Sequence, residues 1–228
     1  MEIEIANIKV SLDATKLILM QKKITDISPL RELTKLTKLN LYHNQISDLS
    51  ALQELTELTE LNLYQNQISD ISPLQNLTKL KKLSLKENKI SNISALQGLT
   101  SLVELDLNFN QVLDISALQW LTKLKELHLH SSKVSDISIL QGLKKLTFLN
   151  LHANPIADIT CLKGLTKLTF LDLGKTQLSD ASDVSVLETL KDLQTLGLEN
   201  ISLASAKIEK IRNALSYSPG VPYCNIRL

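Results

Sequence analysis

The sequence predicts an α/β solenoid, a stack of short units that each contribute one strand and one helical turn. Three observations lead to this prediction. A 22-residue pattern recurs in register eight times, from about residue 15 to residue 200. Leucines alternate with polar residues in one half of each unit, and a Ser-x-Leu-Gln segment recurs in the other half. Because one unit cannot bury its apolar face alone, the units must stack around a shared core.

The first half of each unit is predicted to be a short strand. Leu39 and Leu41 point to one side of it, whereas Lys38, Asn40 and Tyr42 point to the other. Parallel copies about 4.8 Å apart would pair their backbone groups and bury the leucines against their own repeats. The position that sets the register holds Leu17, Leu39, Leu61, Leu83, Leu105, Leu127, Leu149 and Leu171.

A turn follows each strand, and an asparagine marks it. This position holds Asn44, Asn66, Asn88, Asn110 and Asn154, with Lys22, Ser132 and Thr176 as exceptions. An Asn amide can both donate to and accept from backbone groups of a turn. Ser132 and Thr176 can do so only in part, so we expect looser turns there.

The second half of each unit carries signals for the start of a helix. The Ser-x-x-Gln spacing at Ser50, Ser72, Ser94, Ser116 and Ser138 matches a capping box. Pro29 and Pro73 occupy a first helical position, where a missing donor costs nothing. Gly98, Gly142 and Gly164 fall where a helix should stop. We therefore expect short helices or 3-10 turns on the convex side.

Both ends depart from the repeat, as an open stack requires. Residues 1–14 alternate in an apolar pattern that predicts an N-terminal cap with strand character, and residues 182–190 suggest a longer helix. Leu196 and Leu198 predict one more strand, residues 204–216 a helix, and the segment around Tyr223, Cys224 and Ile226 a final strand. We expect one domain over 1–228, with a cap at 1–14, eight to nine repeats at 15–200 and a cap at 201–228.

The pattern Leu-x-x-Leu-x-Leu-x-x-Asn-x-Ile-x-x-Ile resembles the leucine-rich repeat. It is similar to the 22-residue class found in bacterial internalins and in phosphatase-regulatory proteins. The resemblance implies a curved right-handed stack with a parallel sheet on its concave face. It also implies a protein-binding function, either as a bacterial, host-directed protein or as an intracellular regulatory subunit.

Composition and charge bear on which classes of partner and which compartment the sequence favours. The chain has 25 Lys and Arg against 24 Asp and Glu, a net charge of +1, so nothing favours nucleic acid. It lacks the run of about 18 apolar residues needed for membrane insertion. Cys161 and Cys224 cannot form a disulfide framework, and no signal peptide is visible, which favours the cytoplasm. A secreted or surface location holds if a leader has been removed, so the compartment stays open.

The outward positions of the predicted sheet are the candidate binding site. Four rows cross it, and they contain all four histidines and five of the eight Phe, Tyr and Trp residues. The first row is Lys38, Glu60, Lys82, Glu104, Glu126, Phe148 and Phe170, and the second is Asn40, Asn62, Ser84, Asp106, His128, Asn150 and Asp172. The third row is Tyr42, Tyr64, Lys86, Asn108, His130, His152 and Gly174, and the fourth is His43, Gln65, Glu87, Phe109, Ser131, Ala153 and Lys175. Exposed aromatic residues with adaptable polar neighbours are typical of protein interfaces. We expect a monomer that binds a protein partner through Tyr42, His43, Tyr64, Lys86, Phe109, His128, His130, Phe148, His152 and Phe170. The alternative is that Phe148 and Phe170 only stack on each other for stability.

A second class of function is a surface site for a metal ion or small ligand. His128, His130 and His152 are predicted to lie together, with Asp106 and Asp172 nearby. Their spacing matches no local metal motif, so the histidines fit interface residues or a modest pH sensor better. We therefore expect no cofactor and no resident metal.

Enzymatic signals are weak. The sequence contains no Gly-rich phosphate loop, nucleophile elbow or HExxH motif. The aspartates that recur at one register, such as Asp26, Asp48 and Asp70, indicate a structural turn. Cys161 replaces an alanine of other repeats and is predicted to be a packed thiol. Trp120 is either a second, convex contact point or packed on a neighbouring turn, so we predict no catalysis.

Overall fold

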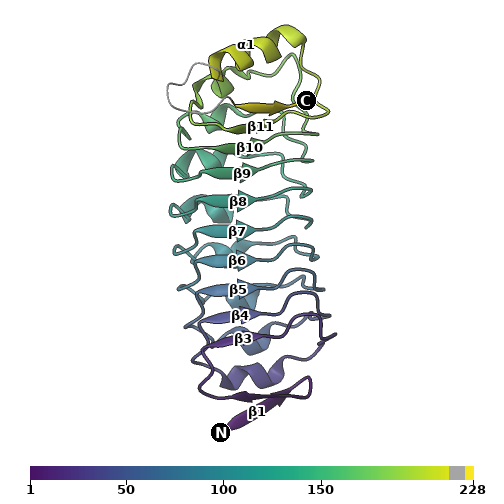
Figure 1. Cartoon of the computed structure of the whole chain (residues 1–228), viewed down its shortest axis with the longest axis vertical. Helices are drawn as coiled ribbons and strands as arrows, with labels where there is room; N and C mark the ends of the chain where they lie inside the picture. Colours follow the sequence, from purple (N-terminus) through teal and green to yellow (C-terminus); the bar gives the residue numbers. More distant parts are fainter. Residues whose placement is uncertain (216–223) are drawn as a thin grey trace.

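A computed structural model describes residues 1–215 and 224–228 and shows a solenoid with a parallel sheet along one face (Figure 1). Within these residues the sheet has ten strands, whose order follows the chain. From β3 to β10, residues paired between neighbouring strands are 22 positions apart in the sequence, for example Leu39 and Leu61. The strands are β3 (Lys16–Ile18), β4 (Lys38–Asn40), β5 (Glu60–Asn62), β6 (Lys82–Ser84), β7 (Glu104–Asp106), β8 (Glu126–His128), β9 (Phe148–Asn150), β10 (Phe170–Asp172), β11 (Thr195–Gly197) and β12 (Asn225–Arg227).

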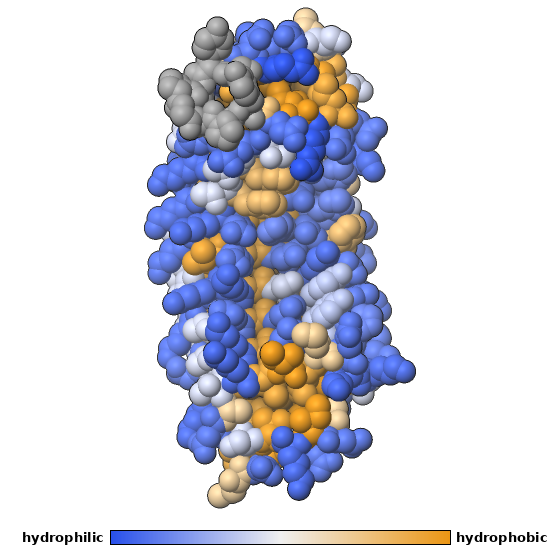
Figure 2. All heavy atoms as spheres, in the orientation of Figure 1, coloured by the Kyte–Doolittle hydropathy of each residue, from blue (hydrophilic) through white to orange (hydrophobic). Residues whose placement is uncertain are grey.

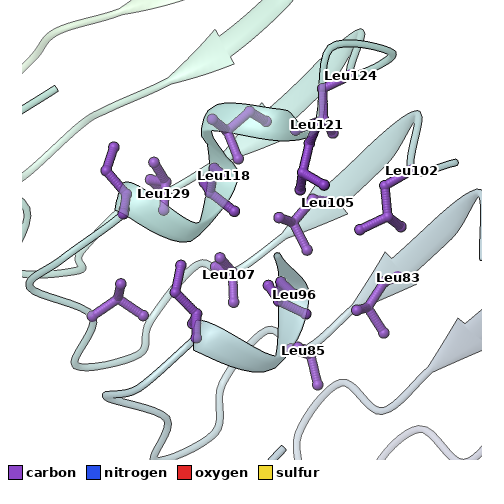
Figure 3. Close-up of a cluster of buried hydrophobic side chains, with 14 of the residues drawn as sticks. Leu83, Leu85, Leu96, Leu102, Leu105, Leu107, Leu118, Leu121, Leu124 and Leu129 are labelled. Atoms are coloured by element: carbon purple, nitrogen blue, oxygen red, sulfur yellow. The ribbon is translucent and has the colours of Figure 1, made fainter. Parts of the chain in front are cut away.

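The core is one continuous column of leucine and isoleucine side chains. The inward leucines of β4 to β11 are buried, including Leu39, Leu41, Leu105 and Leu107, whereas Leu17 of the edge strand β3 is partly buried. Figure 3 shows leucines of neighbouring repeats, among them Leu107 and Leu129, meeting between the strands and the helical turns. The predicted alternation of inward and outward residues is therefore confirmed.

The repeated asparagines join each turn to the one before it. The Nδ2 of Asn110 donates to the carbonyls of Leu85 and Leu107, at 2.9 and 3.1 Å, and its Oδ1 accepts from the N–H of Ile90 at 3.0 Å. This confirms the prediction that the Asn amide both donates to and accepts from backbone groups. At the exceptions the hydroxyl has one proton to donate: Ser132 Oγ lies 3.4 Å from the Leu107 carbonyl, and Thr176 Oγ1 lies 2.6 Å from that of Leu173.

The convex side consists of 3-10 turns. They are η1 (Ser28–Glu32), η2 (Ser50–Leu52), η3 (Ser72–Leu74), η4 (Ser94–Leu96), η5 (Ser116–Trp120), η6 (Ser138–Gly142), η7 (Thr160–Leu162) and η8 (Ser185–Thr189). Pro29 and Pro73 lie in the first helical positions, as predicted. Gly142 ends η6 and Gly98 follows η4, but of the three predicted stop glycines only Gly164 adopts a left-handed backbone, with φ +85°.

The capping-box prediction is wrong. The residue preceding each of these turns makes no capping hydrogen bond with its side chain, as at Ile71 before η3. Instead, an aspartate two residues before the serine accepts from it: Asp70 Oδ1 lies 2.8 Å from Ser72 N, and Asp70 Oδ2 lies 2.9 Å from Ser72 Oγ. A carboxylate accepts more strongly than a hydroxyl. The recurring aspartates are therefore structural, as predicted.

Both caps close the column. At the N-terminus β1 (Glu2–Ile5) and β2 (Ile8–Ser11) form an antiparallel hairpin that buries Ile5 and Val10, which confirms the strand character. At the other end α1 (Ser205–Leu215) and the pairing of β12 with β11 confirm the predicted helix and final strand. The predicted Ser216 end of this helix and Tyr223 lie outside the described residues. The described part of the chain contains no helix with the length and apolarity to span a bilayer.

The longer helix predicted over residues 182–190 is wrong, because η8 covers only Ser185–Thr189. The three additional residues of this repeat form a turn before η8. Ser182 N donates to Ser179 O at 2.9 Å, and Ser182 Oγ donates to Ala157 O at 3.0 Å. The side chain therefore anchors a turn to the preceding repeat and does not begin a helix.

Candidate functional site

The predicted site residues lie on the concave face: Phe148, Phe170 and His128 lie within strands, and the others lie in the turns that follow the strands. Each strand ends at the second outward row, as β4 does at Asn40, so the third and fourth rows lie beyond it. Backbone pairing continues there, since His43 N donates to Tyr64 O at 2.9 Å. Neighbouring repeats therefore keep their spacing, and side chains of one row meet.

The third and fourth rows form a continuous ladder of rings. We use the name ring ladder for Tyr42, Tyr64, Lys86, Phe109, His130 and His152. The Tyr42 and Tyr64 rings stack with centroids 4.7 Å apart, and Lys86 Nζ lies 4.7 Å from the Tyr64 centroid. The same Nζ lies 5.7 Å from the Phe109 centroid, so the ammonium group bridges two aromatic rings.

The ladder continues through the histidines. Phe109 lies 4.6 Å from His130 between ring centroids, and His130 stacks on His152 at 4.7 Å and an interplanar angle of 13°. His152 Nδ1 then lies 3.4 Å from Asp172 Oδ1. Burial, followed by the neighbouring His152, lowers the pKa of His130, which favours the neutral ring in the stack.

Gly174 explains how the ladder ends. A Cβ at this position would lie 2.7 Å from Nδ1 of His152, closer than side-chain atoms approach. Glycine therefore leaves the space that the His152 ring occupies. Gly174 belongs to the third row, but this role was not predicted, because its only signal in the sequence is a glycine next to a ring in the row.

A second stack lies beside the ladder. Phe148 and Phe170 are nearly parallel, with centroids 4.1 Å apart and an interplanar angle of 2°, and His128 lies 4.5 Å from Phe148. The predicted stacking of the two phenylalanines is confirmed. Both rings are only partly buried, so their outer area stays available for contact.

The N-terminal end of the ladder is held by polar contacts. Tyr64 Oη donates to Glu87 Oε1 at 3.0 Å, and this hydrogen bond raises the pKa of Tyr64 because it requires the phenol proton. His43 is exposed, and its Nδ1 lies 2.8 Å from Gln65 Oε1. The two tyrosines are thus fixed in position without a partner.

Residues of the fourth row share a left-handed backbone. Phe109 has φ +55° and is 44% exposed, and His43 also has φ +55°. This conformation is costly for residues other than glycine and asparagine. The turn imposes it in each repeat, so a large aromatic side chain at Phe109 is not explained by local backbone preference.

The second row mostly serves the turns. Asn40, Asn62, Asp106, Asn150 and Asp172 each accept, through Oδ1, a hydrogen bond from the backbone N–H two residues later. Burial raises the pKa of Asp106, although the hydrogen bond from Asn108 opposes this effect. Both aspartates of the metal hypothesis are therefore already engaged in the fold.

The histidines do not converge on a point. Among residues 1–215 and 224–228, no three His, Cys, Asp or Glu side chains are grouped to hold a metal ion. The rings of His130 and His152 are stacked, so their in-plane lone pairs run side by side, while His128 packs on Phe148. This arrangement suits ring contacts and does not suit ligation.

A groove of about 480 Å³ runs over the strands of the N-terminal half of the sheet. Its lining includes the ion pairs Lys38–Glu60, at 2.6 Å, and Lys82–Glu104, at 2.5 Å. These four residues belong to the first row, and the groove itself was not predicted from the sequence. Within each pair the lysine and the glutamate neutralise each other's charge.

Trp120 and Cys161 lie on the convex side, away from the ring ladder. Trp120 is 56% exposed, so it is not fully packed on a neighbouring turn. Cys161 Sγ donates to Ile137 O at 3.2 Å, and burial raises the pKa of this thiol to about 11. A thiol with this pKa is a poor nucleophile at neutral pH, which agrees with the predicted packed cysteine.

Comparison with known proteins gives a family. The sequence matches the family described as Leucine Rich repeats (2 copies) over residues 15–54, 56–98, 78–120 and 122–164. No curated protein sequence matches the chain.

Solved structures give the same answer. Internalin C2 from Listeria monocytogenes is 34% identical, with a TM-score of 0.77, and the match covers 86% of this chain and 85% of that one. A leucine-rich repeat protein of Leptospira interrogans is 27% identical, with a TM-score of 0.75 and coverage of 83% and 50%. The ectodomain of the Arabidopsis thaliana receptor kinase GASSHO1/SCHENGEN3, in complex with CASPARIAN STRIP INTEGRITY FACTOR 2, is 28% identical, with a TM-score of 0.71 and coverage of 86% and 26%.

Proposed function

The chain belongs to the leucine-rich repeat family, and we propose that it binds a partner protein through its concave face, with the ring ladder and the Phe148–Phe170 stack as the contact surface. A protein-interaction module is what this fold implies. The finer assignment to these residues rests on their chemistry and placement. We propose no catalytic role for the surface.

The observation that carries the proposal is the continuity of the ladder. Six side chains from six consecutive repeats contact one another in sequence, and none of them belongs to the buried core. Solvent-exposed repeats need only polar residues at these positions. Rings that are held in place bury much area at a low entropic cost, which is the usual makeup of a binding hot spot.

Pure stacking for stability is the weaker explanation. A ring pair contributes only about 0.5 to 1.5 kcal/mol beyond its burial. The leucine column and the asparagines already hold each repeat, as the Asn110 hydrogen bonds show. Phe109 stays 44% exposed although its ring contacts His130, so stacking uses only part of its surface.

The similar plant receptor ectodomain was solved in complex with CASPARIAN STRIP INTEGRITY FACTOR 2, and the similar Arabidopsis receptor kinase HAESA was solved in complex with the peptide hormone IDA. This supports a polypeptide partner for the present chain. It does not identify that partner, because the match covers 26% of the first receptor chain.

A quantitative pull-down tests the proposal. The double variant Tyr64→Ala, Phe148→Ala removes one ring from each stack, and the convex variant Trp120→Ala removes an exposed aromatic residue elsewhere. We expect specific partners to be recovered by the wild type and by the convex variant, and at least tenfold less by the double variant. Equal recovery by all three, with the double variant folded by circular dichroism, would refute binding through the concave face.

A further inference from the structure

The N-terminal edge of the large sheet is open. β3 is its terminal strand, and the β1–β2 hairpin forms a separate sheet. Leu19 N donates to Asn40 O and Gln21 N donates to Tyr42 O, at 2.8 and 2.9 Å. Because alternate residues of a parallel strand bond to opposite sides, the backbone groups of Lys16, Ile18 and Met20 face away from β4. They make no hydrogen bond with the described residues.

This edge is apolar where the other repeats are polar. Ile18 pairs in register with Asn40 and is 65% exposed, and Met20 is 39% exposed. Figure 2 shows an apolar patch over β3 that continues toward the N-terminal hairpin. Ile8 of the hairpin and Leu12, which follows it, are partly buried and pack against the core. The repeat itself does not require an apolar side chain at Ile18, because Asn40 and Asn62 serve in the same register.

The flanks of the edge are positively charged. Lys16, Lys22 and Lys23 are exposed, and no carboxylate of the described residues pairs with their ammonium groups. Further along the sheet, by contrast, Lys38 and Lys82 are each paired with a glutamate. Charged lysines beside an edge strand discourage pairing with an arbitrary chain. A segment that carries acidic residues would turn the same charge into attraction.

We propose that the β3 edge binds an extended segment of a partner protein, which pairs with Lys16–Met20 as an additional strand. Its apolar residues lie against Ile18 and Met20, and its acidic residues face Lys16 and Lys22. In this mode backbone hydrogen bonds supply affinity, and alternate side chains supply specificity. Among the described residues the β1–β2 hairpin forms its own two-stranded sheet and does not pair with β3, so the outward backbone groups of β3 are left for the segment. This site is separate from the ring ladder.

The probe for this site is a fluorescein-labelled peptide with the sequence Glu-Val-Thr-Ile-Thr-Val-Glu, titrated with the protein by fluorescence anisotropy. Ile18→Pro removes an outward N–H that the fold does not use. Ile18→Asn keeps the backbone edge and substitutes the residue of the next two repeats. Leu113→Asn is the matched control, because Leu113 is 63% exposed on another surface.

We expect saturable binding to the wild type and to Leu113→Asn, a Kd at least tenfold higher for Ile18→Pro, and a Kd at least threefold higher for Ile18→Asn. A peptide with proline in place of both valines should not bind. If Ile18→Pro fails to fold, as judged by circular dichroism, Ile18→Asn decides alone. No binding at millimolar protein, or equal weakening by Leu113→Asn, overturns the proposal. Concentration-dependent dimerisation that Ile18→Asn abolishes also overturns it, because the edge would then bind a second copy.

Discussion

Ser132→Asn should stabilise the protein. Ser132 is 6% exposed and stands where Asn110 and Asn154 stand in the neighbouring repeats. Its hydroxyl makes one long contact, 3.4 Å from Leu107 O. By analogy with Asn110 and Asn154, the new amide would donate to Leu107 O and to the carbonyl of Leu129, and would accept from the N–H of Val112.

The expected change in the free energy of unfolding follows from these hydrogen bonds. Each hydrogen bond contributes about 0.5 to 1.5 kcal/mol net, and fixing the longer side chain costs about 1 kcal/mol. We therefore expect the free energy of unfolding to rise by about 1 to 3 kcal/mol. The measurement is urea unfolding followed by circular dichroism, with an unchanged m-value showing that the unfolded state is unaltered. Asn110→Ser is the reciprocal control and should lower the midpoint. An unchanged or lower midpoint for Ser132→Asn would refute the view that these amides tie the repeats together.

Three further predictions test the core, the turns and the histidines. Leu107→Ala should cost about 2 to 5 kcal/mol because it opens a cavity in the core, whereas Lys86→Ala should stay within about 0.5 kcal/mol; equal urea midpoints would contradict the assignment of inside and outside. The backbone N–H of the following serine lowers the pKa of Asp70 below 3.8, so its stabilising effect is present above that pH and is lost as the pH falls through the folded-state value. Asp70→Asn should therefore reduce the acid sensitivity of the unfolding midpoint, and an unchanged pH profile would count against this role. Isothermal titration with micromolar zinc should give no saturable heat, because the stacked rings of His130 and His152 do not converge; binding would revive the metal hypothesis.

The fold could be predicted because each repeated position has one dominant physical reason. The inward leucines share a core, and Asn110 is the side chain that can both donate and accept in its turn. The capping-box prediction failed where two local partners compete. Asp70 lies close enough to bond both the N–H and the hydroxyl of Ser72, and spacing alone does not rank an aspartate against a glutamine.

The candidate site was less predictable, because contacts between rows depend on how side chains lean. Lys86 belongs to the third row and Phe109 to the fourth, yet the ammonium group of Lys86 joins two rings across these rows. The room that Gly174 leaves for His152 likewise depends on the angle of a ring. The open edge at Ile18 was not predicted. Its exposure depends on how the hairpin departs from the sheet.

Stability and binding are carried by different sides of the same strands. The leucines and the turn asparagines such as Asn110 point inward and hold each repeat. Second-row residues such as Asn40 also serve the turns, but the same register holds Ser84 and His128 in other repeats, so the outward rows can vary without loss of the fold. In the ring ladder the outward residues are side chains that contact and restrain one another. A partner that meets rings already stacked loses less conformational entropy than one that must order separate side chains, and more of the contact energy remains as affinity. The Tyr64–Glu87 hydrogen bond and the His152–Asp172 contact hold the ladder on both sides of Lys86 and thereby keep this surface preorganised.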